Sequence, residues 1–433
     1  MSDTLLGLCA LVVMFLLLFL RQPVWLALLV CGVVGNLILS SLSAVIQVSG
    51  TAALDSVSNY NLSVVPLFVL MGEIASNSRM STELFKAARA LTSGMRGGLA
   101  VAAVVASGGF STICGSSIAT AATMSRIALP EMRAAGYPNG YAAGAIAAGG
   151  TLGILIPPSI ILVIYAAIAE QSVPRLFAAS MIPGIVLLGL YVLVTVIAAP
   201  KDLAVVTGPR EALRDRLAAL LEAWPFLTLF VVTIGGIYTG LFSPTEAAAI
   251  GAFFAILLGV LRRQLGWASI IRSLKATIIT SGILLTILIG ATVFAQFVVQ
   301  TRLPQALLEA ADGLALPPWV VMALIVLVYL VLGCFLETIG SVLITVPIFL
   351  PVIVAYGYDP IWFGVLVVIL AELGLLTPPV GMNLFIIKAQ APDIAMGELF
   401  LGIIPFLAAP LVMIAIMFAL PAITSWLPAL FYG

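Results

Sequence analysis

Long apolar runs, separated by short polar segments, extend along almost the whole chain. An α-helix rises about 1.5 Å per residue, so about twenty apolar residues cross the roughly 30 Å hydrocarbon core of a bilayer. The pattern therefore predicts an all-α polytopic membrane protein. Its transmembrane helices are expected at about residues 5–20, 24–47, 61–78, 139–168, 176–199, 224–241, 245–261, 276–300, 361–388 and 398–425.

Two further apolar stretches, 98–130 and 318–351, each carry a cluster of small and polar residues near the middle. The cluster divides each stretch into two arms that are too short to cross a bilayer comfortably. Irregular backbone at membrane depth is tolerated only where protein buries it or where it lines a cavity. We therefore predict two re-entrant hairpins, each entering and leaving the membrane on one side.

A motif that ends in two prolines occurs twice, inside 139–168 and again inside 361–388. The segment Gly153–Pro158 returns 221 residues later as Gly374–Pro379. The same offset, without a gap, also aligns Pro130 with Pro351, Gly136-Tyr137 with Gly357-Tyr358, and Leu152 with Leu373. Two halves that each contain a helix broken at mid-membrane depth are typical of secondary transporters built from inverted repeats.

The repeat divides the chain into five predicted parts. These are N-terminal scaffold helices (1–60), repeat 1 (61–200), an amphipathic linker helix (201–223), further scaffold helices (224–275) and repeat 2 (276–433). In the linker, charged residues alternate with leucines, which favours a helix lying along the cytoplasmic membrane surface. We expect it to brace one half against the other, and a solvated linker is the alternative.

Composition agrees with a membrane protein, since 63% of the residues are apolar and only 8% are charged. The net charge is zero, so no basic surface for nucleic acid is expected. The four cysteines, Cys9, Cys31, Cys114 and Cys334, stand singly in apolar surroundings and are expected to be small core residues. Cys114 is the least certain of them because it borders the first hairpin tip.

Charge also predicts the orientation. Asp3 precedes the first helix and Arg21 follows it, which favours an uncleaved helix with its N-terminus outside. This orientation places every basic residue except Arg175 and Arg302 on the cytoplasmic side, including Lys388. The first hairpin then opens to the cytoplasm and the second to the outside, so the repeats have opposite topology, and the C-terminus is expected outside.

Hydroxyl groups and glycines form both hairpin tips. The first tip is Gly115-Ser116-Ser117, the second is Glu337–Ser341, and the offset pairs Ser116 with Glu337 and Ser117 with Thr338. Hydroxyls and exposed carbonyls at helix breaks are oxygen ligands for Na⁺. Membrane hydroxyls often bond back to their own helix instead, but two matched tips favour the ligand interpretation.

The proline pairs extend this hypothesis. Each pair removes two backbone donors and frees carbonyls one turn upstream, although a simple kink is the alternative. We expect one Na⁺ site in each half, with candidate ligands Ser116, Ser117, Gly150, Thr151, Gly153, Glu337, Thr338, Gly340, Ser341, Gly374, Thr377 and Gly381. Substrate is expected between these sites, near Ser117, Pro157, Pro158, Ser159, Thr338, Pro378, Pro379 and Asn383.

Acidic residues inside a membrane are costly, so they are functional candidates. Glu337 and Glu372 lie in the repeated motifs and can supply charge to a cation site, whereas Glu73 and Glu246 are equally interpretable as structural acceptors. No basic residue lies beside the four motifs. An anionic substrate is therefore expected to meet helix N-termini, hydroxyls and a bound cation.

Several motifs together resemble the large membrane subunit of tripartite ATP-independent periplasmic (TRAP) transporters, end to end. They are Gly115–Ser117, Gly153–Ser159, Gly240–Ala248, Glu337–Pro347 and Gly374–Asn383, of which the last two are the most specific. Glu337 departs from the aspartate more usual in the family, which leaves its role as a cation ligand open.

The resemblance implies a multi-pass protein of the bacterial inner membrane that imports organic acids such as C4-dicarboxylates, keto acids or sugar acids with Na⁺. It implies two partners, a small four-helix membrane subunit and a periplasmic substrate-binding protein. It also implies an elevator mechanism, in which hairpins and broken helices move as a block against a scaffold.

Three alternatives remain at this point. A stand-alone Na⁺/carboxylate symporter would share these motifs but would need no binding protein. A channel is disfavoured because the sites occur as two differing copies in one chain, not as a symmetric ring. An enzyme is disfavoured further, because the chain has no histidine and no nucleophile with an obvious base.

Overall fold

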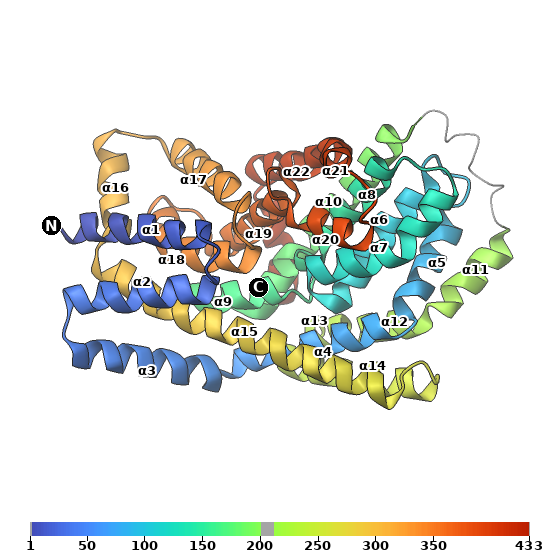
Figure 1. Cartoon of the computed structure of the whole chain (residues 1–433), viewed down its shortest axis with the longest axis horizontal. Coiled ribbons are helices and arrows are strands. Elements are labelled where there is room, and N and C mark those ends of the chain that lie inside the picture. Colours follow the sequence, from blue (N-terminus) through green and yellow to red (C-terminus); the bar gives the residue numbers. More distant parts are fainter. Residues whose placement is uncertain (1, 201–211, 433) are drawn as a thin grey trace.

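The computed structural model describes residues 2–200 and 212–432, and every regular element in this part of the chain is helical (Figure 1). The helices before the linker are α1 (Asp3–Phe19), α2 (Val24–Leu39), α3 (Leu42–Ser58), η1 (Tyr60–Ser63), α4 (Val64–Asn77), α5 (Met80–Thr92), α6 (Gly98–Cys114), α7 (Ser117–Ala134), α8 (Asn139–Thr151), η2 (Leu152–Ile154), α9 (Ile160–Ala169) and α10 (Val173–Ala198).

The remaining helices follow in the same style. They are α11 (Leu213–Glu222), α12 (Trp224–Phe230), η4 (Val231–Gly235), α13 (Gly236–Tyr238), α14 (Pro244–Leu261), α15 (Trp267–Gln300), α16 (Leu303–Gly313), α17 (Pro318–Gly333), α18 (Thr338–Ala355), α19 (Pro360–Leu376), α20 (Met382–Gln390), α21 (Met396–Ile403), η5 (Ile404–Leu407), α22 (Ala408–Ala419) and α23 (Ala422–Tyr432).

Membrane-spanning capacity is clear from length and composition. Within the described residues, five helices are long and apolar enough to cross a bilayer, and two bent helix pairs raise that number to seven. One of the five is α18, the second arm of the predicted hairpin 318–351. The expectation that both arms of each hairpin are too short is therefore wrong for α18, because its 18 residues rise about 27 Å.

Some predicted boundaries also need correction. The stretch 24–47 is not one helix, because Ser40 interrupts it and Ser41 caps a new helix, α3. The stretch 398–425 divides at the extended Leu420, after which α23 continues to Tyr432. Helix α15 begins at Trp267, nine residues before the predicted start at 276. Apolar content alone could not locate these interruptions, since both sides of each break are apolar.

The offset of 221 residues reappears in the helix boundaries. Helices α7 and α18 differ by 221 at both ends, and α8 and α19 both begin 221 residues apart. Both proline pairs follow directly in their halves, each with a cis peptide bond between its prolines. After each pair a short helix begins, α9 in the first half and α20 in the second. The two broken helices predicted at 139–168 and 361–388 are therefore present.

The two hairpins approach each other from opposite ends of the molecule. In Figure 1, α6 and α7 lie toward one end and α16–α18 toward the other. At the base of the first hairpin, the Leu99 amide donates to the Tyr137 hydroxyl at 3.3 Å. At the base of the second, the Tyr356 hydroxyl donates to Asp312 at 2.8 Å. This arrangement supports the predicted inverted repeat, whose orientation in a membrane stays a prediction.

A scaffold of α2, α3, α4, α14 and α15 runs along one side of the molecule (Figure 1). Helices α2 and α15 approach closely because glycines face the opposite backbone. A Cβ at Gly32 would lie 2.8 Å from the Phe294 nitrogen, and one at Gly290 would lie 2.9 Å from the Trp25 carbonyl oxygen. Small residues allow such backbone contact between membrane helices, so these two helices form a rigid pair.

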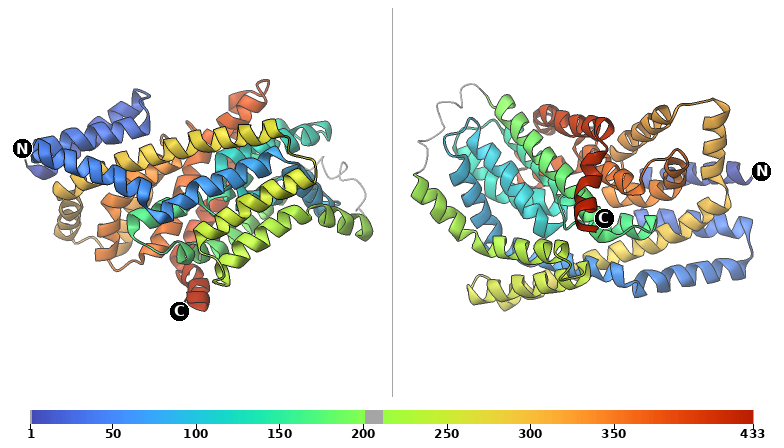
Figure 2. Two further views of the ribbon diagram at one scale, coloured as in Figure 1. Left: turned by 90° about the horizontal axis from the view of Figure 1, so that it is seen from below. Right: turned by 180° about the vertical axis from the view of Figure 1, so that it is seen from behind.

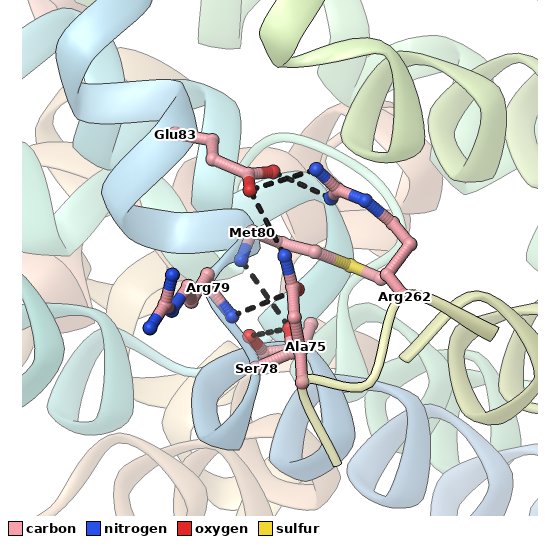
Figure 3. A network of polar contacts seen from close by, with 7 residues as sticks. Ala75, Ser78, Arg79, Met80, Glu83 and Arg262 are labelled. Carbon is pink, nitrogen blue, oxygen red and sulfur yellow. Dashed lines mark hydrogen bonds and ion pairs between the residues drawn. The ribbon is translucent and has the colours of Figure 1, made fainter. Parts of the chain in front are cut away.

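A polar network fixes the ends of α4, α5 and α14 together (Figure 3). Arg262 donates two hydrogen bonds to Glu83, at 2.7 and 2.9 Å, and stacks over the Trp224 ring. Gln264 donates to the same carboxylate and accepts from the Arg79 amide. A bidentate arginine–carboxylate pair holds its geometry better than a single contact. The network therefore joins α5 to the scaffold.

A second closely packed body contains the broken helices. Gly140 and Gly144 of α8 face the backbone of α21 at Glu398 and Gly402. A Cβ at Gly333 of α17 would lie 2.9 Å from the Gly374 Cα of α19. As in the scaffold, glycine removes the side chains that would hold these helices apart.

The described part of the linker agrees with the prediction. Helix α11 has no buried residue, and its leucines Leu213, Leu217 and Leu221 are exposed. Residues 201–211 of the predicted linker lie outside the described residues. Figure 2 shows α11 at one edge of the molecule and the C-terminal helix α23 protruding from its middle.

Ion pairs connect loops that the charge pattern assigns to one side. Arg89 pairs with Glu131 at 3.0 Å, Arg133 pairs with Asp393, and Glu83 pairs with Arg262. All of these residues lie in segments predicted to be cytoplasmic. The pairs place the segments together at the same end, as the topology requires, but which side of the membrane they face stays a prediction.

Candidate functional site

Both hairpin tips line one cavity of about 470 Å³. The first tip contributes Gly115, Ser116 and Ser117, and the second contributes Glu337 and Thr338. These segments are separated by more than 200 positions in the sequence. The structure thus brings together the two tips that the repeat singled out, and the cavity is the candidate binding site.

Local sequence shapes the first tip. Gly115 ends α6 with φ of +61°, a left-handed conformation that favours glycine. Ser116 then caps α7, because its hydroxyl accepts a hydrogen bond from the Ala119 amide at 3.3 Å. The turn between α6 and α7 is therefore only two residues long, and it directs the start of α7 toward the cavity.

The second tip has a different chemistry at the matching positions. Glu337 precedes α18 with extended backbone, but its side chain makes no capping hydrogen bond. The buried hydroxyls of Thr338 and Ser341 have no hydrogen-bond partner among the described residues. Buried polar groups are normally paired, so this tip has oxygens available for a ligand.

Three helices begin at the cavity. The first residues of α7, α9 and α18 are among its lining residues, namely Ser117, Ile160 and Thr338. Unpaired backbone amides and the helix dipole make such N-termini favourable places for anions. The same cavity contains the carboxylates Glu73 and Glu337 and no lysine or arginine among its lining residues. Its polar groups therefore suit an anion accompanied by a cation.

The scaffold forms the opposite wall. Helix α4 contributes Val69 and Glu73, and α15 contributes Thr280 and three further apolar residues, Ile283, Leu284 and Ile287. Sequence reasoning left Glu73 open as a structural acceptor, and the structure places it in the cavity. Thr280 was missed, and a polar residue in the middle of a 34-residue apolar helix is the signal that could have identified it.

The first helix break lies directly behind the first tip. A Cβ at Gly153 would lie 3.0 Å from the Ser116 carbonyl, and one at Gly150 would lie 3.3 Å from the Ser117 oxygen. The Pro158 oxygen approaches Gly115 in the same way, at 3.1 Å from its hypothetical Cβ. Pro157 and Ser159 are buried in this layer without lining the cavity. The break thus supports the tip from behind.

The second break is placed differently. Gly374 packs against Gly333 on the other arm of its own hairpin, and Thr377 donates to the Leu373 carbonyl at 2.6 Å. Pro379 is exposed, and Pro378 is partly exposed. Of this whole segment only Leu375 lines the cavity.

Several predicted site residues therefore lie outside the cavity wall. Thr151 donates to the Ala148 carbonyl and contacts the Tyr191 hydroxyl, and Gly340 packs against Val24 of the scaffold. The residues not brought to the cavity are Gly150, Thr151, Gly153, Pro157, Pro158, Ser159, Gly340, Ser341, Gly374, Thr377, Pro378, Pro379, Gly381 and Asn383. Their assignment to cation or substrate binding stays a prediction.

Two uncertain assignments are resolved by local geometry. Glu246 forms a capping box with Ser243 at the start of α14, which is the structural role that the sequence left open. Cys114 is buried and lines the cavity, whereas Cys9 is exposed, so the expectation of a core position is wrong for Cys9. An apolar helix face exposed to lipid has the same composition as one facing a core.

Comparison with known proteins agrees with this arrangement. The family model described as "Tripartite ATP-independent periplasmic transporter, DctM component" matches residues 11–423. The C4-dicarboxylate TRAP transporter large permease of Pseudomonas aeruginosa is 37% identical over 375 residues, which cover 86% of each chain. The sialic acid TRAP transporter large permease of Vibrio cholerae serotype O1 is 34% identical over 420 residues, covering 94% of this chain and 98% of the relative.

A solved structure shows a similar fold at low sequence identity. The YdaH transporter of Alcanivorax borkumensis aligns with a TM-score of 0.58 and 15% identity, over 99% of this chain and 98% of that chain. At this identity the likeness concerns the fold alone. The family match, by contrast, extends over almost the entire chain, so this protein belongs to the DctM component family of tripartite ATP-independent periplasmic transporters.

Proposed function

We propose that this chain is the large permease of a TRAP transporter and imports an organic acid anion with Na⁺ across a bacterial inner membrane. The observation that carries this proposal is the single cavity formed where the two hairpin tips meet. Relatives of the chain are named for C4-dicarboxylates and for sialic acid, both of which are organic acids. Which organic acid this chain carries depends on the shape of the cavity.

Helix N-termini supply the contacts for the substrate carboxylate. The starts of α7, α9 and α18 converge on the cavity, and the hydroxyls of Ser117 and Thr338 lie at two of them. Backbone amides at these positions bind an anion without a basic side chain. The apolar side chains from α15 leave room for the less polar part of the substrate.

The charges of the cavity support coupling to Na⁺. An anionic substrate would enter a cavity that already contains Glu73 and Glu337. Like charges in a site of low dielectric repel strongly, so a bound cation is needed to balance them. The unpaired Thr338 hydroxyl and the Glu337 carboxylate are oxygen ligands suited to Na⁺.

The packing supports an elevator movement. Glycine-mediated contacts hold α2 to α15 on the scaffold side and α8 to α21 on the other side. Between these bodies lies the cavity, whose scaffold wall is mostly apolar. One polar contact across the boundary is the Ser76–Thr123 hydroxyl pair at 2.9 Å, between α4 and α7. Few such bonds would need to break when the block slides.

The tripartite family name supports two partners, a small membrane subunit of four helices and a periplasmic substrate-binding protein. We further propose that both termini of the chain lie on the periplasmic side. A stand-alone Na⁺/carboxylate symporter is the second candidate. It would show the same Na⁺ dependence, but its uptake would not require the binding protein.

The testing experiment is uptake of radiolabelled organic acids into proteoliposomes that contain the chain. Uptake is measured with and without an inward Na⁺ gradient, and with and without the small subunit and the binding protein. Uptake that requires both Na⁺ and the binding protein is expected. Na⁺-driven uptake by the chain alone would overturn the partner assignment, and Na⁺-independent uptake would overturn the coupling.

Tip variants connect this assay to the site. We expect Ser117→Ala and Thr338→Ala to raise the Na⁺ concentration for half-maximal uptake about threefold to tenfold, since each removes one oxygen contact worth roughly 1 kcal/mol. Ser125→Ala is a matched control, because that hydroxyl donates to the Ala121 carbonyl of its own helix. Unchanged Na⁺ activation in both tip variants would count against the tips as ligands.

A further inference from the structure

Glu372 lies in the interior of the protein, outside the cavity wall. Its side chain belongs to the middle of α19, and the residue is 2% exposed. Both carboxylate oxygens are buried and have no hydrogen-bond partner among the described residues. Leu375, one helical turn further along α19, lines the cavity. Glu372 therefore lies behind the cavity, about one turn from its wall.

Three other helices bring oxygen atoms to the same region. The Tyr191 hydroxyl of α10 interacts electrostatically with the Glu372 carboxyl and lies 3.0 Å from the Thr151 hydroxyl of α8. One turn before Thr151 on α8, the Ala147 carbonyl accepts a hydrogen bond from the Asn383 amide of α20 at 3.3 Å. The other amide atom, Asn383 Oδ1, is buried and unpartnered.

These four residues do not satisfy one another. A buried carboxylate without a hydrogen bond or counter-charge costs several kcal/mol, and natural proteins pair such groups or bind a cation there. No basic side chain is hydrogen-bonded or ion-paired to Glu372 within the described residues. Packing alone also gives no reason for a carboxylate at this position, since its neighbours in α19 are apolar.

The oxygens present define the chemistry of the missing partner. A carboxylate, an amide carbonyl and two hydroxyls are oxygen ligands, which suit hard cations. One negative charge balances one monovalent cation and leaves the buried site neutral, whereas a divalent cation would leave an uncompensated positive charge. The set thus favours Na⁺ over a divalent metal.

We propose that Glu372, Tyr191, Thr151 and Asn383 form a monovalent-cation site, separate from the hairpin tips, that Na⁺ occupies. Glu372 is its anionic ligand. The site lies within the body that contains the two helix breaks, so the ion binds to α8, α10, α19 and α20 together. This inference extends the proposed Na⁺ coupling but rests on different residues, so either can fail without the other.

The test measures equilibrium binding of radiolabelled Na⁺ to the purified full chain, without substrate. Wild-type protein is compared with Glu372→Gln, which keeps the size of the side chain and removes its charge. We expect the variant to bind one Na⁺ fewer per chain. Glu309→Gln is the matched control, because Glu309 is an exposed residue of α16 and should leave the stoichiometry unchanged.

A second variant guards against misfolding of the first. Tyr191→Phe removes one hydroxyl from the site and preserves the buried ring, and we expect it to weaken one Na⁺ binding event at least threefold. The tip variants Ser117→Ala and Thr338→Ala, measured in parallel, report on the other sites. If only they alter Na⁺ binding, the inference is overturned while the proposed coupling stands.

The opposite result would separate the two ideas in the other direction. If Glu372→Gln lowers the stoichiometry while the tip variants do not, this site stands and the tip assignment fails. If Glu372→Gln binds Na⁺ as the wild type does but releases one proton fewer on titration, the carboxyl carries a proton and the Na⁺ site is overturned.

Discussion

The two hairpin tips occupy matching positions in the repeat but differ in how completely their polar groups are satisfied. At the first tip, Ser116 caps α7 and the glycines of the first break support the turn from behind. At the second tip, Glu337 makes no capping hydrogen bond and Thr338 has an unpartnered hydroxyl. A repeated sequence frame has therefore produced one tip that is complete by itself and one that has oxygens available for a ligand.

The breaks differ in the same direction. The first proline pair is buried behind its tip, whereas Pro379 of the second pair is exposed. We infer that the second half holds the cation more dynamically and that the first half acts as the more rigid wall. Substitutions that exchange features between the halves can test this difference.

The largest effect is expected from Glu337→Ser, which gives the second tip the residue found at Ser116. Losing the carboxylate removes a charged ligand, and contacts to charged groups are worth roughly 1.5–3 kcal/mol. Na⁺-driven uptake at limiting Na⁺ should fall by about tenfold to a hundredfold. Glu309→Ser, on an exposed helix face, is the control. Normal Na⁺ dependence in Glu337→Ser would mean that the two tips are interchangeable.

A smaller but clear effect is expected from Gly153→Ala on the rigid side. The new Cβ would lie 3.0 Å from Ser116 backbone atoms, which cannot move aside as a flexible side chain can. Overpacking of this kind costs about 1–3 kcal/mol, so the thermal unfolding midpoint in detergent should fall. Gly136→Ala is no suitable control, because Gly136 has a positive φ; Gly189→Ala, with open space around it, is. Equal midpoints for the two variants would contradict a preassembled first tip.

Gly340→Ala should change stability by less than about 1 kcal/mol, because alanine favours the helix by about that amount. The offset pairs Gly340 with Ala119, so this substitution also makes the halves more alike. The new Cβ meets only Val24 side-chain atoms, at 3.2 Å and beyond, and these can shift. The unfolding midpoint and uptake are the two measurements. A large loss of uptake with an unchanged midpoint would show that α2 and the second tip must slide closely past each other.

The smallest effect is expected at the hairpin bases. Arg133 holds the pKa of Asp393 below its usual range through a hydrogen bond, while Val354 occupies the position matched to Arg133. A depressed pKa contributes stability above the ordinary pKa of aspartate, about 3.9, and this is lost as the pH falls through the lower value in the folded protein. The pair is exposed, so Asp393→Asn should lower the unfolding midpoint only slightly at neutral pH. The difference from wild type should disappear in acid, and a difference that grew there would refute this assignment.

The sequence by itself determined the class of protein, the broken helices and the residues at the tips. Apolar runs of membrane length and repeated proline pairs are local signals, because backbone hydrogen bonding in lipid leaves few alternatives to a helix. The family resemblance was also readable, since the motifs Glu337–Pro347 and Gly374–Asn383 are contiguous in the chain. Boundaries such as the α2–α3 interruption were not readable, because a serine pair between apolar segments does not by itself end a helix.

Only the tertiary structure decided which candidate residues share one cavity. It selected Ser116, Ser117, Glu337 and Thr338, added Glu73 and Thr280, and placed Glu372 in a different buried cluster. The physical reason is that a site in this fold is assembled by packing between helices distant in sequence, where side-chain direction depends on helix rotation and on close glycine contacts. A 221-residue repeat fixes which positions correspond, but not which of their side chains the packing turns toward a common space.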